Sequence, residues 1–273
     1  MIKFPRTSAM TLAFRLSAAL FLLPAAAAAQ ESDADLAQKL ANPVASMISV
    51  PFQGNYDCCF GPDDASRYTL NIQPVIPFKL GQDWNLIVRT ILPVIYQERL
   101  SPSVGAASGL GDVTQSFFFA PSRTIGGFTL AAGPALLWPT GESELGSKKW
   151  GAGPTALILK QDRGYTYGLL ANHIWSYADL GDNDRGDVST TFVQPFFSWT
   201  NPKATTFSLN AESSYNWKSE AWTIPINAAV SHLYKFGDQR VSLGGAVRVY
   251  AAREEGGPEW GLRLTATFLY PEK

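Results

Sequence analysis

The 273-residue sequence is poor in charged residues and in the residues that most often carry out chemistry. Charged side chains make up 16% of the sequence, whereas roughly 25% is usual in soluble domains. Histidine occurs only at positions 173 and 232, and cysteine occurs only at the neighbouring positions 58 and 59. This composition argues against a disulfide-stapled scaffold, a histidine-rich metal centre and the heavily charged surface of an ordinary soluble protein.

The adjacent cysteines, Cys58 and Cys59, leave three states open: a vicinal disulfide, two free thiols, or two ligands to a soft metal. Two cysteines without a nearby histidine make a poor metal site, because structural metal sites normally need more ligands. We therefore expect a structural or incidental role for the pair, with no bound metal and no cofactor.

The first thirty residues have the pattern of a secretory signal peptide. Three basic residues precede an apolar run at residues 16–23, and small residues follow this run up to Ala29. This run is too short to span a bilayer, for which about twenty apolar residues are needed. We predict that residues 1–29 are removed by cleavage near Ala29, which places the rest of the chain outside the cytoplasm.

The mature chain then carries 19 basic and 23 acidic residues, a formal charge of about −4. It has no basic stripe, so we expect no nucleic-acid partner. No linker rich in glycine, serine or proline divides it, which predicts a single domain at residues 44–271. No later apolar run is long enough for a membrane-spanning helix.

Apolar and polar residues alternate along most of this domain. In WGLRLTATFLY, residues 260–270, the aromatic and aliphatic residues occupy every second position. Successive side chains of an extended strand point to opposite faces, so each such run predicts a strand with one apolar face. About twelve runs follow Val44. Four of them are less regular: residues 112–120, 150–161, 165–178 and 187–199.

The connectors between the runs alternate between short and long. We predict short periplasmic turns at residues 80–83, 122–127, 162–164, 201–204 and 236–239. We predict outer loops at residues 57–67, 98–111, 141–149, 179–186, 253–259 and, as a short exception, 218–220. This pattern is typical of bacterial outer-membrane proteins. The predicted fold is all-β: a closed antiparallel transmembrane β-barrel of about twelve strands with both chain ends in the periplasm.

The polar faces consist mainly of threonine, serine, asparagine, glutamine and glycine, which suit a wet interior better than a soluble exterior. Tryptophan and tyrosine lie near the ends of the runs, as in the aromatic belts of membrane barrels. We therefore expect lipid to contact the apolar faces. Prolines within the predicted strands, at positions 74, 93, 134, 154, 195 and 225, are expected to mark bulges or kinks.

Residues 30–43 form a separate N-terminal segment, for which we predict a short periplasmic helix. Ser32 is a suitable N-cap, Leu36 and Leu40 lie one turn apart, and Pro43 stops the helix. The sequence leaves open whether this segment plugs the barrel or only leads into the first strand.

Four charged residues are predicted to point into the lumen: Arg89, Glu212, Arg248 and Arg263. Counted from the short turns, the last three lie at one level near the membrane midplane. Charged residues inside membrane proteins often mark a solute path. One interpretation is a salt-bridge cluster that fills a narrow barrel, and the other is a constriction that selects solutes.

An acidic cluster occupies one predicted outer loop and consists of Asp179, Asp182, Asp184 and Asp187. These residues could bind Ca²⁺ or bridge to lipopolysaccharide through cations. Their spacing is not that of an EF-hand loop, so a solvated acidic loop is the favoured interpretation.

An outer-membrane enzyme is the least favoured class. His173 lies near the outer end of its predicted strand and His232 near the inner end of another, so they cannot act together. The chain also lacks a G-x-S-x-G motif, and the cysteines lie far from both histidines in this topology. We therefore expect no enzymatic activity.

Four stretches carry a family resemblance: SGLGDVTQSFFFAP (108–121), WGAGPTALILKQ (150–161), ANHIWSYA (171–178) and WGLRLTATFLYP (260–271). They resemble a family of Gram-negative outer-membrane barrels catalogued as transporters and associated with the meta-pathway of phenol degradation. The resemblance runs from about Ala41 to the C-terminus and implies an outer-membrane barrel. It carries no substrate residues onto this chain, which departs from the general pattern of outer-membrane proteins by ending in YPEK.

We expect a passive channel for small solutes, and the resemblance alone adds aromatic or apolar compounds to the candidates. The alternative is a closed barrel with a structural or surface-interaction role. Expected partners are outer-membrane lipid, lipopolysaccharide and a small-molecule solute.

Overall fold

The computed structural model describes residues 31–101, 104–142, 144–181 and 184–270, and the chain from Glu31 onward forms one compact unit. The predicted signal peptide lies outside the described residues, as does Asp182. The elements, in chain order, are α1 (Asp33–Leu40), β1 (Ile48–Phe60), β2 (Ala65–Ile72), β3 (Val75–Leu80), β4 (Trp84–Gln97), β5 (Ala107–Leu110), β6 (Val113–Pro121), β7 (Thr129–Trp138), β8 (Lys149–Asp162), β9 (Tyr165–Asp179), β10 (Ser189–Thr200), β11 (Thr205–Ala211), β12 (Ser213–Asn216), β13 (Ala221–Phe236), β14 (Gln239–Ala252) and β15 (Trp260–Tyr270).

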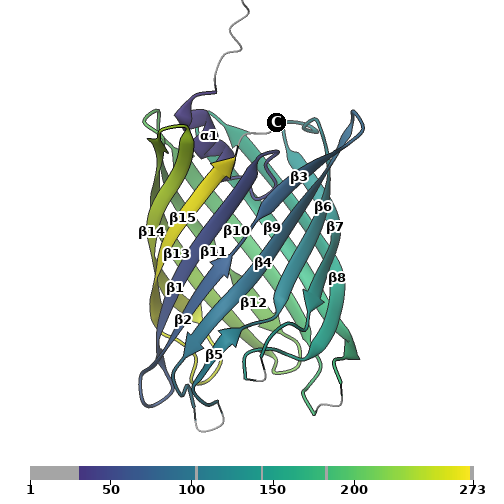
Figure 1. Ribbon diagram of the computed structural model, residues 1–273, viewed down its shortest axis with the longest axis vertical. Coiled ribbons are helices and arrows are strands. Elements are labelled where there is room, and N and C mark those ends of the chain that lie inside the picture. The colour runs from purple at the N-terminus through teal and green to yellow at the C-terminus, as the bar shows by residue number, and fades with distance from the viewer. Residues whose placement is uncertain (1–30, 102–103, 143, 182–183, 271–273) are drawn as a thin grey trace, which may run out of the picture. The chain divides into compact units, whose positions relative to one another are not determined.

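The strand segments form one closed antiparallel barrel, seen from the side in Figure 1. Three barrel strands are each made of two consecutive segments, β2 with β3, β5 with β6, and β11 with β12, so the barrel has twelve strands. Pairing of β15 with β1 closes it, in a register that runs from Ile48 opposite Tyr270 to Cys58 opposite Trp260. The predicted fold class, a closed barrel of about twelve strands with a short N-terminal helix, is confirmed.

The apolar rows of the strands face outward. On β15, Leu264 is 73% exposed while its neighbour Arg263 is 7% exposed. A soluble protein does not expose a continuous apolar surface of this kind. The low content of charged residues follows from this arrangement, because the exterior needs few charges and the interior holds only a limited number.

The connectors have different lengths at the two ends of the barrel. Short turns follow β3, β6, β8, β10 and β13 at one end of the barrel, which we call the short-turn end. Longer connectors follow β4, β7, β9 and β14 at the opposite end, which we call the long-loop end. The segment α1 lies at the short-turn end, as does the end of β15 (Figure 1).

Two predicted outer loops are wrong in their extent. In residues 98–111, strand β5 already begins at Ala107 and pairs with β4. Residues 57–67 were expected to form an outer loop, but β1 continues to Phe60 and β2 begins at Ala65, which leaves a tight connection of four residues. Cys58 and Cys59 form a disulfide, beside a register irregularity between Asp57 and Phe60. Glycine, aspartate and cysteine in this stretch suggested a loop, but pairing with β15 overrides that local tendency.

The interior of the barrel has an apolar half. Buried side chains from β3, β4 and β6 to β9 pack together, with Phe192 and Phe196 of β10 against them. The buried members of this apolar cluster are Val44, Val75, Ile87, Phe118, Ala120, Ala131, Leu157, Leu159 and Leu170. Strands β6 to β10 are therefore apolar on both faces along part of their length, which explains the less regular alternation in four of the runs.

The N-terminal segment folds as predicted into a short helix. Ser32 caps α1 by accepting a hydrogen bond from the backbone N–H of Asp35. Among the described residues, no helix has the length and apolar character needed to cross a bilayer. The buried face of α1 and the residues after it pack on Ala204, Leu233 and Leu269 at the short-turn end.

The prolines only partly follow the prediction. Pro74 lies in the break between β2 and β3, and Pro225 lies at a register shift on β13. Pro93 lies opposite the break between β5 and β6, where the register of β4 with these two segments changes by one residue. The other three pair in register without a bulge at their position: Pro134, Pro154 and Pro195. A proline removes one donor, but a shift in register would turn every following side chain to the wrong face, so register is kept.

Candidate functional site

A layer of charged and amide side chains crosses the polar half of the lumen. Arg263 on β15 donates from Nη1 to Glu212 Oε1 (2.8 Å) and from Nη2 to Oε2 (2.7 Å). Glu212 lies between β11 and β12, so this two-pronged contact joins barrel strands that are not neighbours. Such a geometry is the strongest form of arginine–carboxylate contact.

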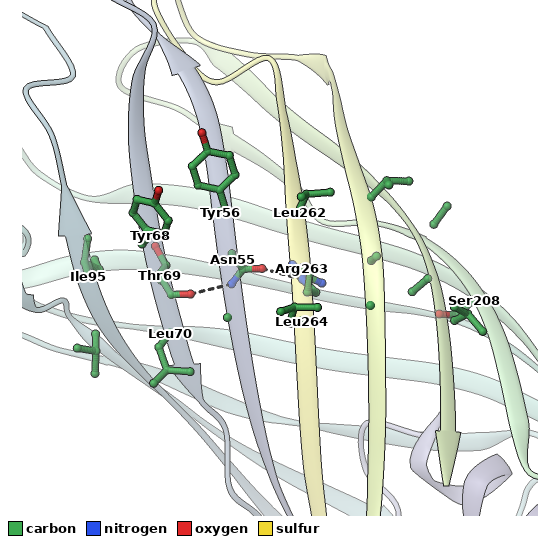
Figure 2. A pocket seen from close by; sticks show the side chains of 18 of the residues that line it. Asn55, Tyr56, Tyr68, Thr69, Leu70, Ile95, Ser208, Leu262, Arg263 and Leu264 are labelled. Carbon is green, nitrogen blue, oxygen red and sulfur yellow. Dashed lines mark hydrogen bonds between the residues drawn. The ribbon is translucent and has the colours of Figure 1, made fainter.

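Asn55 on β1 connects the two arginines of this layer. Its Oδ1 accepts hydrogen bonds from Arg248 Nη1 (2.6 Å) and Arg263 Nε (2.7 Å), and its Nδ2 donates to the Thr69 carbonyl (3.2 Å). Figure 2 shows Asn55 between Thr69 and Arg263, with Leu262 and Leu264 flanking Arg263 on β15. One amide therefore holds two guanidinium groups at a fixed separation.

A second acidic residue completes the layer toward the long-loop end. Tyr250 donates its hydroxyl hydrogen to Asp57 Oδ1 (2.8 Å) and accepts from Arg248 Nη2 (3.2 Å). Arg248 Nε lies 3.4 Å from the same Asp57 oxygen without a hydrogen-bonding geometry. We call Asn55, Asp57, Glu212, Arg248 and Arg263, together with Tyr250, the charged layer.

The structure brings together three of the four predicted lumen charges: Glu212, Arg248 and Arg263. Arg89 on β4 also points inward but contacts none of the three directly, and its Nη2 donates to Gln73 Oε1 (2.9 Å). Arg248 and Arg263 are buried, at 8% and 7% exposure, so the stability of the layer depends on their carboxylate and amide partners. Removing one partner from a buried charge pair typically costs about 3–5 kcal/mol.

Sequence reasoning missed Asn55, Asp57 and Tyr250. The sequence pattern did contain them, because each is a polar residue that follows another inward polar residue at a spacing of two. These polar series are Gln53, Asn55 and Asp57 on β1, and Arg248 and Tyr250 on β14. Asp57 was assigned to a loop, and alternation alone does not say which inward residues meet across the lumen.

Two cavities lie on either side of the charged layer. The inner cavity, at the short-turn side, has a volume of about 290 Å³ and is bounded by Gln53, Gln73 and Arg89 near the layer. The outer cavity, of about 350 Å³, is bounded by Asp57 and Tyr250. Among the described residues, no lining residue is shared by the two cavities. The charged layer therefore separates them.

The N-terminal segment forms the wall of the inner cavity at the short-turn end. Gln38 in α1 donates to the Tyr165 carbonyl (3.2 Å) and accepts at its own carbonyl from Gln161 Nε2 (2.7 Å). Asp33 pairs with Arg240 at 2.8 Å. These contacts reach from the β8–β9 hairpin to β14, and residues 41–47 continue along the cavity. The segment lies across the mouth of the lumen.

A much larger hollow, of about 1520 Å³, lies on the outside of the barrel and not in the lumen. Its lining is almost wholly apolar and includes the outward side chains of Tyr68, Leu70, Leu262 and Leu264, drawn in Figure 2. We assign it to the outward wall of the barrel, because these side chains continue the exposed apolar rows of the neighbouring strands.

Two of the acidic loop residues, Asp179 and Asp187, are paired with lysines. Lys149 contacts Asp179 and lies 3.7 Å from Asp187, which also lies 3.8 Å from Lys218. Asp184 is exposed. Within the described residues, no three His, Cys, Asp or Glu side chains converge in a way that could hold a metal ion. Sequence reasoning missed Lys149, the buried first residue of β8.

The two histidines lie on different parts of the barrel, as predicted. His173 faces outward, with Nδ1 2.7 Å from Thr191 Oγ1 and Nε2 3.5 Å from Ser189 Oγ. Its ring lies 4.0 Å from that of Trp175, which places it in the aromatic belt. The Nδ1 partner is a hydroxyl and not a carboxylate, and the serine contact is at the limit of hydrogen bonding, so these residues do not form a catalytic triad.

No family model matches the sequence, and no curated protein matches it either. Two solved structures share the fold. An outer membrane channel from Pseudomonas putida F1 is 14% identical, with a TM-score of 0.64 over 82% of this chain and 96% of that chain. A NanC porin is 11% identical, with a TM-score of 0.51 over 80% of this chain and 98% of that chain.

At these identities the likeness shows the fold, which is that of outer-membrane barrels. It does not extend to a shared solute. The resemblance to the family associated with phenol degradation stays a prediction.

Proposed function

We propose that the protein is an outer-membrane channel for the passive passage of small solutes, with the charged layer as its selective constriction. The observation that carries the proposal is the position of this layer between two cavities that lie toward opposite ends of one lumen. Two solved structures that share the fold, a channel and a porin, support this assignment. The outward apolar rows would contact outer-membrane lipid and lipopolysaccharide.

The composition of the lumen supports small solutes that are partly apolar. One side of the lumen is the charged layer, whose hydrogen-bonding groups can replace water around a polar group. The opposite side is the apolar cluster, which offers no hydrogen bonds but packs against a ring or an alkyl chain. A solute with both characters would lose less hydration energy here than a purely polar solute of the same size.

The short-turn end would face the periplasm, because short turns occupy that side in outer-membrane barrels. The segment α1 and residues 41–47 would then block the periplasmic exit. Passage of a solute requires this segment to move, which would break its apolar packing on the barrel, the hydrogen bonds of Gln38 and one ion pair. The Asp33–Arg240 pair is half-exposed on the aspartate side, and exposed ion pairs contribute at most about 1 kcal/mol.

The alternative is a closed barrel with a structural or surface-interaction role. It is favoured by the same two features, since the charged layer and the N-terminal segment each fill part of the lumen. Conductance of the purified mature protein in planar bilayers separates the two. Discrete current steps that change in Arg263→Ala or Arg248→Ala support the channel, whereas a silent bilayer in all three proteins supports the closed barrel.

The bilayer experiment needs a control that changes an arginine outside the layer. Arg253→Ala is suitable, because Arg253 lies in a connector at the long-loop end and pairs with Glu259 there. Steps that are altered equally by Arg253→Ala and by Arg263→Ala would contradict the assignment of the layer as the constriction.

A further inference from the structure

Arg89 carries a positive charge that no carboxylate contacts directly in the described part of the chain. In the charged layer, Arg248 and Arg263 are matched by two carboxylates, Asp57 and Glu212. Arg89 has no carboxylate within salt-bridge distance in the described part of the chain, and its hydrogen-bond partner is the neutral amide of Gln73. A cation held beside an amide in a membrane barrel is expensive unless something else compensates it.

This charge borders the inner cavity. Arg89 is the one charged side chain among the described residues that line it, and the lining contains no aspartate or glutamate. Ser198, which also lines the cavity, has a buried hydroxyl without a hydrogen-bond partner in the described structure. The hydroxyl oxygen itself is shielded from the cavity, so Arg89 is the group that an anion in this space would meet.

The remaining lining is mixed. Val75 and Phe196 form an apolar patch, and Leu40 and Met47 of the N-terminal segment add to it. The volume of about 290 Å³ corresponds to roughly ten water molecules at about 30 Å³ each. The cavity can therefore hold a small molecule with one anionic group and a compact apolar body.

We infer that the inner cavity is a binding site for small amphipathic monocarboxylates, with Arg89 as the anion subsite. The guanidinium has five N–H donors, and the bond to Gln73 uses one of them, so an edge remains to receive a carboxylate. The apolar body then packs on Val75 and Phe196. The role of this site in transport rests on the proposed channel function, but binding itself does not require conduction.

Binding is tested by calorimetric titration of the purified mature protein in detergent with benzoate and hexanoate. Benzamide serves as the neutral analogue and acetate as the anion without an apolar body. Benzoate and hexanoate are expected to bind at least tenfold more tightly than benzamide or acetate. Equal affinity for benzoate and benzamide in the unaltered protein would overturn the inference, whatever the variants do.

Two variants locate the anion subsite. Arg89→Gln is expected to weaken benzoate binding roughly ten- to hundredfold, the range for a hydrogen-bonded charge, and to remove the preference over benzamide. Gln73→Glu keeps the arginine but places a competing carboxylate beside it, so a similar loss is expected from a protein with an intact cation. Unchanged benzoate affinity in both folded variants contradicts the assignment.

Arg67→Gln is the matched control. Arg67 also faces an amide, with Nε and Nη2 donating to Gln97 Oε1 at 3.1 and 2.8 Å, but it borders the outer cavity. Its replacement is expected to leave benzoate binding unchanged, and an equal loss would indicate a general charge effect and overturn the inference. Current steps without benzoate binding would refute this site and leave the channel standing, whereas binding without any conductance would refute the channel alone.

Discussion

Glu212 and Arg263 meet across the lumen through two hydrogen bonds of 2.8 and 2.7 Å, although β13 and β14 separate their barrel strands. Their contact spans a chord of the barrel and does not follow the ladder of neighbouring strands. It therefore ties the charged layer together independently of backbone pairing. The first prediction concerns the charge that this contact compensates.

Glu212→Gln is expected to shift the selectivity of the channel toward anions. The substitution keeps the size of the side chain but leaves Arg263 without its carboxylate, so the layer becomes more positive. The measurement is the reversal potential of single channels under a salt gradient. Glu144→Gln, in an exposed connector, should leave that potential unchanged. A reversal potential equal to that of the unaltered protein would show that Glu212 does not face the ion path.

Asn55→Leu is expected to destabilise the barrel by about 3 kcal/mol or more, because Arg248 and Arg263 both lose their shared acceptor. Each hydrogen bond to a charged group is worth about 1.5–3 kcal/mol. Asn55→Asp keeps an acceptor there and adds a negative charge, so it should be far less damaging. Urea unfolding in detergent, followed by circular dichroism, compares the two. Equal midpoints for both variants would refute the role of Asn55 as the connector.

Removal of residues 31–43 is expected to raise single-channel conductance several-fold, because α1 forms the wall of the inner cavity at the short-turn end. Asp33→Asn is the matched control: it removes only an ion pair worth at most about 1 kcal/mol and should leave conductance near its original value. If the shortened protein conducts no better than the full mature chain, the segment is not the barrier.

Leu264→Lys is expected to destabilise the barrel by about 2–4 kcal/mol, the cost of a lysine on the lipid face near the bilayer midplane. The neighbouring Thr265→Lys points into the inner cavity and should cost much less. Unfolding in lipid vesicles tests the pair. The opposite order would mean that the apolar rows do not face lipid.

The strands and their inward residues could be predicted from the sequence because period-two alternation survives wherever one face is apolar and the other polar. Leu264 and Arg263 are an example, since the two faces of β15 differ at almost every position. The alternation weakened on the strands that carry Phe118, Leu157 and Leu170, because the inward residues there are apolar as well. The existence of these strands was still visible, but their packing into a core inside the barrel was not.

The contacts of the site could not be predicted, because they join residues on strands that are not neighbours. Alternation places Arg248, Arg263 and Glu212 inside the barrel, but it does not say that Asn55 lies between the two arginines. The separation of Arg89 from the group depends on which side of the lumen each strand occupies. That position follows from closure of the barrel and not from any local pattern.

The interior is divided into an apolar cluster on β3, β4 and β6–β9 and a charged layer on β1, β14, β15 and the break between β11 and β12, which has a consequence for redesign. Apart from Arg89 on β4, the groups that set the width of the lumen and those that set its charge lie on separate walls, so each property can be changed alone. Replacing Phe118 or Leu157 by a smaller residue would widen the passage while the charged layer keeps its hydrogen bonds, and exchanging charges on β14 or β15 would alter ion preference without changing the apolar wall.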